Sequence, residues 1–253
     1  MVNIKSKSEI ELMQASAEIL IEVLKSLERE IQPGVTTSQL DQIAEKIILS
    51  RGAIPSFKGY SMYDCMDYPA SICASVNDQV VHGIPDSRSL CAGDIVSIDV
   101  GVFYKGFHSD AARTWGVSTI SSKAASIIEV AKASFFKGVE MAVKDNRISD
   151  ISGAIEDYVL ENGYSIVTDL TGHGIGRKLH EDPSIPNFRN KYKGPRLQNG
   201  MALAIEPMIN QGTSRVRTLE NKWTVVTADG KLSAHYENTV IVNDNKPLIL
   251  TLY

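Results

Sequence analysis

Four acidic residues stand where strand-forming sequence normally excludes charge. Asp99 ends the run Ile-Val-Ser-Ile, Asp110 lies inside the next strand-like segment, Glu206 ends Met-Ala-Leu-Ala-Ile, and Glu237 precedes Asn-Thr-Val-Ile-Val. Aspartate is depleted in strand interiors, and a buried charge is costly unless it is paired. One such acid is ordinarily a solvated strand end or half of an ion pair, whereas four of them indicate a shared cation.

The first two acids belong to a predicted β-hairpin. If Lys105-Gly106 is its two-residue loop, Asp99 lies opposite Ala112 and Asp110 lies opposite Gly101. The two carboxylates are then diagonal neighbours on one face, with Cβ atoms ~7–8 Å apart or less. Carboxylates this close repel each other, so one holds a proton or both share a divalent cation.

Three of the five histidines have surroundings suited to a site. His173 lies among three glycines, where backbone could approach a ligand closely; His180 follows just before Glu-Asp-Pro, and His82 has apolar neighbours on both sides. A neutral imidazole beside carboxylate oxygens suits Mn, Fe, Co or Zn. A core histidine held by one hydrogen bond is the alternative for each of the three, and it is the preferred interpretation of His108 and His235.

Other catalytic chemistries lack their motifs. The sequence contains no H-E-x-x-H and no G-x-S-x-G, and the glycines around His173 do not form a nucleotide-binding loop. Cys73 is interpreted as a small apolar wall residue rather than a nucleophile. Three cysteines without C-x-x-C spacing predict neither a disulfide framework nor a cysteine zinc site.

Composition limits the class of protein. The 253 residues contain no linker or low-complexity segment, so we expect one domain spanning 1–253. A net charge of −4 lacks the basic footprint of a nucleic-acid-binding protein. The absence of a long apolar run or signal-peptide pattern predicts a cytoplasmic protein that does not enter a membrane.

The elements that must position these side chains alternate helices with strands. A capping box of Ser8 and Glu11 predicts the start of the first helix, which must stop by Pro33-Gly34, and Thr36 with Gln39 predicts the start of the second. Further helices are predicted at 122–143 and 149–162. Strands are predicted at 71–76, 94–100, 107–117, 165–168, 202–205, 223–227 and 235–242, and residues 183–199 are predicted to be a surface excursion.

A short internal sequence similarity relates the two halves of the chain. Residues 93–99 and 200–206 each begin with a turn glycine, continue as a mostly apolar strand and end in an acid, Asp99 or Glu206. Together with the paired helices in each half, this similarity suggests a duplicated α/β unit.

These motifs, in their order, resemble the type I methionine aminopeptidase family. The segments that carry the resemblance are Val-Val-His82-Gly-Ile-Pro, Asp-Ile-Val-Ser-Ile-Asp99-Val, Gly-Phe-His-Ser-Asp110, Thr-Gly-His173-Gly-Ile-Gly-Arg-Lys-Leu-His180-Glu-Asp-Pro, Ala-Ile-Glu206-Pro-Met and Ala-His-Tyr-Glu237-Asn-Thr. The resemblance covers nearly the whole chain, although residues 111–162 match mainly as a pattern.

The resemblance implies an α+β fold, the pita-bread fold. Two α/β halves related by a pseudo-twofold axis form a curved, mainly antiparallel sheet covered by helices, around a site for two divalent metal ions. Asp99 would chelate one ion, His173 and Glu206 would bind the other, and Asp110 and Glu237 would bridge them. Co, Mn, Fe and Zn all remain open as the metal.

The implied activity is removal of the initiator methionine from nascent proteins. His82 and His180 would contact the scissile amide and stabilise the transition state, and Glu206 would also accept a proton from the attacking water. The side chains implied for the methionine pocket are Tyr68, Cys73, Leu179, Met208 and Trp223. The expected partner is the N-terminal methionine of a nascent polypeptide, with a transient ribosome contact, no nucleic acid or membrane, and a monomeric state.

Departures from the family pattern and rival functions stay open. Leu179 replaces a frequent aromatic residue, His235 a frequent glutamine and Asn238 a frequent histidine, and residues 61–67 lack the usual tyrosine arrangement. One rival is a proline-specific pita-bread peptidase of the aminopeptidase P or prolidase type. Another is a pita-bread binding module without catalysis, and a third is a protein whose acids only form structural ion pairs.

Overall fold

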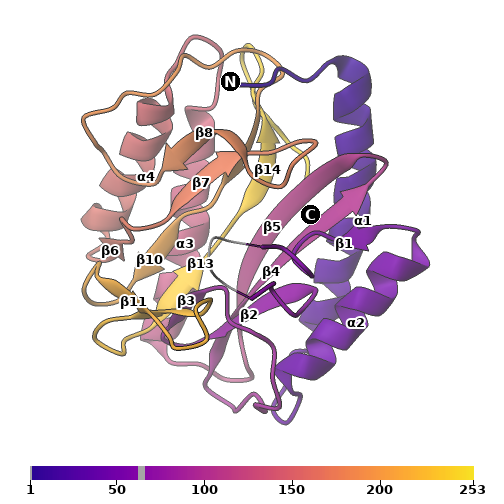
Figure 1. The fold of residues 1–253 in the computed structure, drawn as a ribbon. Coiled ribbons are helices and arrows are strands. Elements are labelled where there is room, and N and C mark those ends of the chain that lie inside the picture. The colour runs from indigo at the N-terminus through magenta and orange to yellow at the C-terminus, as the bar shows by residue number, and fades with distance from the viewer. Residues whose placement is uncertain (1, 62–65) are drawn as a thin grey trace.

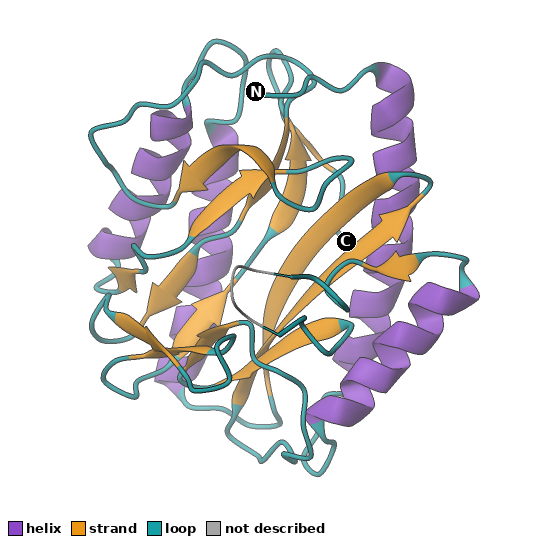
Figure 2. Ribbon diagram, in the orientation of Figure 1, coloured by secondary structure: helices purple, strands orange, loops and turns teal. Residues whose placement is uncertain are grey.

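Two pairs of helices flank the strands of the computed structural model, which describes residues 2–61 and 66–253. Helices α1 (Lys7–Glu30) and α2 (Thr37–Ser50) lie on one side of the molecule, and α3 (Ser122–Glu140) and α4 (Ile148–Glu161) on the other (Figures 1 and 2). Each pair packs an apolar face on the strands of its own half. No helix in the described ranges combines the length and apolarity that crossing a membrane requires.

The first helix begins two residues earlier than the sequence predicted. Ser6 is extended (φ −69°, ψ 165°), its hydroxyl accepts from the Glu9 amide, and the Glu9 carboxylate accepts from the Ser6 amide at 2.9 Å. Ser8 therefore lies inside α1, and the predicted capping box of Ser8 and Glu11 is wrong. The capping box predicted at the start of α2 is confirmed.

The strands form four sheets whose ladders are antiparallel among the described residues. The first sheet holds β1 (Ile54–Pro55), β2 (Ile72–Val76), β4 (Ile95–Tyr104) and β5 (Phe107–Gly116). The largest holds β7 (Thr171–Gly174), β8 (Glu181–Pro186), β9 (Ala202–Ile205), β14 (Asn238–Ile241) and β15 (Leu248–Ile249). The remaining two hold β6 (Ser165–Ile166), β10 (Met208–Asn210) and β13 (Ser233–His235), and β3 (Gln79–Val81), β11 (Val216–Thr218) and β12 (Val225–Thr227).

The β4–β5 hairpin has the predicted register. Asp99 lies opposite Ala112, and Asp110 lies opposite Gly101. Both residues of the loop Lys105-Gly106 have positive φ, +49° and +87°, as a two-residue turn that follows the strand twist requires. The two carboxylates therefore leave the hairpin from one face.

Two paired chain segments each leave strand conformation at the same position along the ladder: one between β9 and β10, the other between β13 and β14. Strand β9 pairs with β14 and β10 pairs with β13, so Glu206-Pro207 in one chain segment faces Tyr236-Glu237 in the other. The Tyr236 amide donates to the Pro207 carbonyl at 3.3 Å across the break. The strand predicted at 235–242 is therefore two strands, and the break releases both glutamates from the ladder.

Strand β5 of the first half lies against β13 and β14 of the second. The Thr239 hydroxyl accepts from the Asp110 amide and donates to the Asp110 carbonyl, both at 2.9 Å. The Glu237 amide donates to the Ala112 carbonyl at 3.0 Å. These bonds fix the distance between the hairpin acids and Glu237, because they join the backbones that carry them.

The glycine-rich segment around His173 is the strand β7, which the sequence did not predict. A Cβ added at Gly172 would lie 2.4 Å from the Ala204 carbonyl oxygen, and one at Gly174 would lie 2.1 Å from that of Asp182. These glycines therefore let β7 pack between β8 and β9, and close approach of their backbone to a ligand stays a prediction. The excursion predicted at 183–199 is also partly wrong, since β8 extends to Pro186.

The segment before α1 fastens the loop that carries His180. The Lys5 amide donates to the Gly200 carbonyl at 2.8 Å, and Lys5 Nζ lies 2.7 Å from Glu181 Oε2, both side chains being 5% exposed. The other Glu181 oxygen accepts from the Lys178 amide at 3.1 Å. A buried ion pair thus connects the start of the chain to the residue next to His180.

Replacing Lys5 with methionine is expected to lower the free energy of unfolding by about 3 kcal/mol, because it leaves the buried Glu181 carboxylate unpaired. Urea denaturation followed by circular dichroism measures the change. Lys7→Met, at an exposed position in the first turn of α1, is the matched control. Adding Glu181→Met to the Lys5→Met variant removes the unpaired charge and should recover most of the lost stability. Equal denaturation midpoints for Lys5→Met and the control would contradict the expectation.

Candidate metal centre

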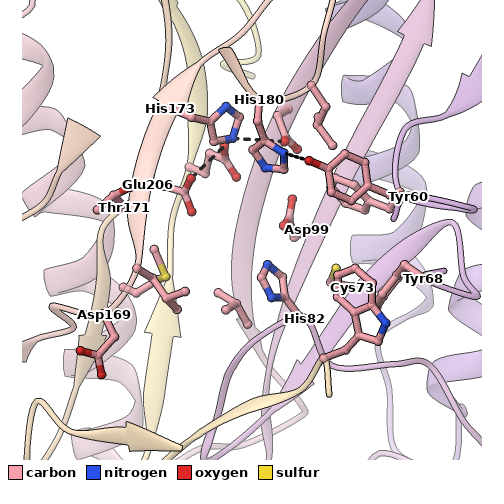
Figure 3. A pocket seen from close by; sticks show the side chains of 18 of the residues that line it. Tyr60, Tyr68, Cys73, His82, Asp99, Asp169, Thr171, His173, His180 and Glu206 are labelled. Atoms are coloured by element: carbon pink, nitrogen blue, oxygen red, sulfur yellow. Dashed lines mark hydrogen bonds and ion pairs between the residues drawn. The ribbon is translucent and has the colours of Figure 1, made fainter. Parts of the chain in front are cut away.

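A cavity of about 790 Å³ lies between the two halves, and Figure 3 shows many of the side chains that line it. This volume suits a small ligand or the end of a peptide. The lining includes every site residue predicted from the sequence: Tyr68, Cys73, His82, Asp99, Asp110, His173, Leu179, His180, Glu206, Met208, Trp223 and Glu237.

Four carboxyl groups converge at this cavity. Asp110 and Glu237 are 3% and 1% exposed. Burial raises the pKa of Asp99 to about 7, and burial together with the neighbouring acids raises the pKa of Asp110, Glu206 and Glu237 well above ordinary values. The folded protein therefore disfavours four negative charges here unless a cation or protons neutralise them.

The side chains form two candidate ligand groups that share one glutamate. Asp110, His173 and Glu237 make one group, and Glu206, His235 and Glu237 make the other, with the ligand atoms of each within 4.8 Å of one another. Asp99 is in neither group, but it is close enough to Asp110 for its charge to raise the pKa of Asp110. Oxygen and imidazole ligands at this spacing suit divalent transition metals.

Unpartnered atoms test whether a cation fits. Asp99 Oδ1, Asp110 Oδ1, Glu237 Oε1 and His235 Nε2 are buried, and none of these atoms has a hydrogen-bond partner. Buried polar atoms are normally satisfied, so a cluster of unsatisfied acceptors aimed at one region requires an explanation. Divalent cations bound there would supply the missing partners, and the residues present fit such ions.

His173 presents a lone pair to the carboxylates. Its Nδ1 lies 2.8 Å from the Gly174 carbonyl oxygen, which can only accept, so the ring carries its proton on Nδ1. Burial and the nearby His180 lower the pKa of His173 to about 3, which keeps the ring neutral. Its Nε2, 3.6 Å from Glu206 Oε1, is therefore available to a metal.

His82 and His180 face the same cavity (Figure 3). His82 has left-handed backbone with φ 56°, a conformation that non-glycine residues adopt mainly where surrounding structure enforces it. Burial and His180 lower the pKa of His82 to about 4, and burial lowers that of His180. Both rings are thus neutral at physiological pH and can donate or accept hydrogen bonds.

The apolar wall of the cavity combines rings, sulfur and an aliphatic side chain. Tyr68 and Trp223 meet edge to face at 5.1 Å, and Tyr68 donates to the Gly83 carbonyl at 2.9 Å, which fixes its ring. Burial raises the pKa of the Cys73 thiol, so it stays protonated as a wall residue does. Leu179 and Met208 are 4% and 1% exposed.

Sequence reasoning missed Tyr60 and His235. Tyr60 lines the cavity, and its hydroxyl lies 2.5 Å from His180 Nδ1. His235, which was expected to have no special surroundings, lies 3.6 Å from Glu206 and 3.9 Å from Glu237, so that expectation is wrong. The only signal in the sequence was the departure at position 235 from the family pattern.

The other departures have separate outcomes. Asn238 accepts hydrogen bonds from Arg113 and Thr251 at 2.7 and 2.9 Å, so it has a structural role behind Glu237. The Arg113 guanidinium also donates to the Glu237 carbonyl at 2.5 Å and stacks over the Tyr236 ring. The departure at residues 61–67, which lack the usual tyrosine arrangement, falls largely on residues 62–65, and these lie outside the described residues.

Comparison with known proteins identifies the family. The sequence profile of metallopeptidase family M24 matches residues 11–244. The chain is 57% identical to a methionine aminopeptidase of Clostridium perfringens, over 100% of this chain and 99% of that one. The chain belongs to the methionine aminopeptidases of family M24. It is also 46% identical to methionine aminopeptidase 1 of Bacillus subtilis, over 99% of both chains.

Solved structures confirm the expected fold. The methionine aminopeptidase of Thermotoga maritima superimposes with a TM-score of 0.95 at 37% identity, covering 100% of both chains. A prolidase of Pyrococcus furiosus, 24% identical, reaches a TM-score of 0.77 over 99% of this chain and 65% of the other, which shows a shared fold. The chain therefore has the pita-bread fold, and its membership of a metallopeptidase family supports the use of divalent metal.

The metal-free protein is expected to lose stability as pH rises. Folding raises the pKa of Asp99 from 3.8 to about 7, so its stabilising contribution is complete below about pH 4 and is lost as pH rises through about 7. The loss amounts to about 1.4 kcal/mol for each unit by which a pKa is raised. Melting temperatures of metal-free protein between pH 5 and 8 measure it.

Asp99→Asn is expected to make this dependence less steep, because the amide does not ionise while the other three carboxyl groups still do. Added Mn²⁺ is expected to flatten the dependence in the unmodified protein. Glu129→Gln, on an exposed position of α3, is the control. A metal-free protein whose melting temperature stays constant over this range would show that the carboxylates do not repel one another.

Proposed function

We propose that the chain is a metal-dependent aminopeptidase that removes N-terminal methionine from nascent proteins, with residues 1–253 acting as one catalytic domain in the cytoplasm. The observation that carries the proposal is a single cavity with a carboxylate–imidazole cluster at one side and a wall of Tyr68, Cys73 and Trp223 at the other. Relatives 57% and 46% identical over nearly their full length are named methionine aminopeptidases.

The proposed centre holds two divalent ions. Asp99 would chelate one, His173 and Glu206 would bind the other, and Asp110 and Glu237 would bridge them. Bound ions of this kind polarise a carbonyl group and lower the pKa of water. Co, Mn, Fe and Zn all suit the ligands, and availability decides among them.

Three side chains around the centre have proposed catalytic roles. Glu206 lines the cavity beside the proposed ions and accepts the proton of the attacking water as general base. His82 and His180 contact the scissile amide and stabilise the transition state as neutral imidazoles. We propose that the Tyr60 hydroxyl, 2.5 Å from His180 Nδ1, is the donor in that contact, which leaves the ring proton on Nε2, where it can be donated in a hydrogen bond.

The wall of the cavity suits a methionine side chain. A flexible thioether packs favourably against aromatic edges and sulfur, and Tyr68, Cys73, Leu179, Met208 and Trp223 supply these groups. The proposed partner is therefore the free N-terminus of a polypeptide. We also propose a transient ribosome contact and a monomeric enzyme.

A Met-Ala-Ser peptide is expected to lose its methionine when the metal-free protein is supplied with Mn, Fe, Co or Zn, each tested separately. Mass spectrometry of the products measures cleavage, and an Xaa-Pro peptide is the matched substrate control. Cleavage of the Xaa-Pro peptide alone would assign the chain a proline-specific activity.

Metal content separates an enzyme from a binding module. Asp110→Ala is expected to bind less metal and to lose most cleavage, because it removes a proposed bridging ligand. Equal metal content and equal behaviour in the variant and the unmodified protein would favour a non-catalytic module, and activity that survives chelation would reject the metal-dependent reaction.

Tyr60→Phe is expected to lower kcat about 3- to 10-fold with little change in KM, because the loss of one hydrogen bond leaves the His180 ring less well oriented. Steady-state kinetics on the Met-Ala-Ser peptide measure both constants. Tyr164→Phe, whose hydroxyl donates to Ser126 on the exposed surface, is the control. A rise in KM without a change in kcat would instead place Tyr60 in the methionine pocket.

A further inference from the structure

His235 lies at the end of β13, directly beside the carboxylate cluster. Its side chain is 2% exposed. Its Nε2 lies 3.6 Å from Glu206 Oε2 and 3.9 Å from Glu237 Oε2, and it has no hydrogen-bond partner. A buried, unpartnered ring nitrogen that faces two carboxylates is an unusual arrangement, because buried polar atoms are nearly always satisfied.

The spacing does not suit direct hydrogen bonds. An N–H···O bond spans ~2.7–3.2 Å between heavy atoms. Two ligand atoms that are each ~2.1 Å from a common ion stand ~3.0 to 3.4 Å apart at right-angled to tetrahedral geometry. The separations of 3.6 and 3.9 Å around His235 are closer to the second spacing than to the first.

His173 provides an internal standard. It is the histidine implied as a ligand by family resemblance, and its Nε2 lies 3.6 Å from Glu206 Oε1 and 4.0 Å from Asp110 Oδ2. His235 has almost the same distances to its own pair of acids. Glu206 is thus bracketed by two imidazoles, one facing each of its oxygens.

The backbone holds His235 in this position. Its amide donates to Thr114 Oγ1 at 3.0 Å, and the Thr114 hydroxyl donates to the His235 carbonyl at 2.8 Å. On its other side His235 pairs with Met208 in the ladder between β13 and β10. The backbone of His235 is therefore fixed between β5 and β10, which keeps its side chain beside the acids.

We propose that His235 is a metal ligand, and that its Nε2 binds the ion held by Glu206 and Glu237. This inference rests on the proposed metal centre and adds a second imidazole to it. A site with two imidazoles favours ions such as Zn, Fe or Co over Mn, which prefers oxygen ligands. His235 therefore tunes which metal the centre retains.

X-ray absorption spectroscopy of the zinc-loaded protein tests the proposal, because imidazole ligands give a characteristic outer-shell scattering. In the unmodified protein two imidazoles serve two zinc ions, so the expected average is about one imidazole per zinc. His235→Gln removes one of these rings and is expected to lower that average to about one half. Glutamine keeps a hydrogen-bond donor at this position, so a role limited to hydrogen bonding would leave the count unchanged. His108→Gln is the matched control, because Nδ1 of this histidine lies 2.8 Å from Ser56 Oγ, outside both ligand groups.

A crystal structure of the zinc-loaded, unmodified protein decides the question even if His235→Gln does not fold. A distance of ~2.0–2.1 Å between Nε2 and zinc is expected. A distance above 3 Å would overturn the proposal while leaving the metal centre intact. Zinc that does not bind at all in a calorimetric titration would instead overturn the proposed function on which it rests.

Discussion

Repulsion among four buried carboxyl groups is the constraint that organises this molecule. Asp99, Asp110, Glu206 and Glu237 converge in a place where burial raises each pKa. Removing one ionised carboxylate from water costs several kcal/mol unless a charge of opposite sign compensates it. The proposed pair of divalent ions carries four positive charges, which balance the four carboxylates. Binding of the ions would therefore also neutralise the buried negative charge.

The fold holds these acids together in spite of that repulsion. The hairpin of β4 and β5 supplies two of them from one face, and the common break in β9–β10 and β13–β14 supplies the other two. Hydrogen bonds from Thr239 and from the Glu237 amide join the two sources. Regular strands could not deliver Glu206 and Glu237 in this way, because their side chains would follow the ladder's alternation.

Much of this arrangement could be predicted from local sequence. The loop Lys105-Gly106 fixes the hairpin register, and the register alone brings Asp99 and Asp110 to one face. The helices follow apolar periodicity, and their limits were predicted to within a few residues. Residue type and surroundings also marked Glu206, Glu237 and His173 as candidates, but only family resemblance joined them to one centre and supplied the wall of the cavity.

The features that escaped prediction depend on contacts between distant segments. Strand β7 is short and rich in glycine, so its strand conformation comes from packing between β8 and β9 rather than from its own residues. His235 resembles an ordinary strand residue until Thr114 and Met208 fix it beside the acids. The start of α1 was misplaced because Ser6 and Ser8 both have a glutamate three residues later, and only the backbone conformation distinguishes them.

The ligand groups draw on both halves of the fold, with β5 on one side of the junction and β7, β13 and the turns beside them on the other. The group of Asp110, His173 and Glu237 needs both halves, whereas Glu206, His235 and Glu237 all lie in the second half. Glu237 is the ligand that both groups require. Because Glu237 follows the other ligands in the sequence, the growing polypeptide would complete neither group until Glu237 has been synthesised and its amide bonds the Ala112 carbonyl. Capture of ions by the proposed centre would therefore be a late step of maturation, after the second half has been made and packed against the first.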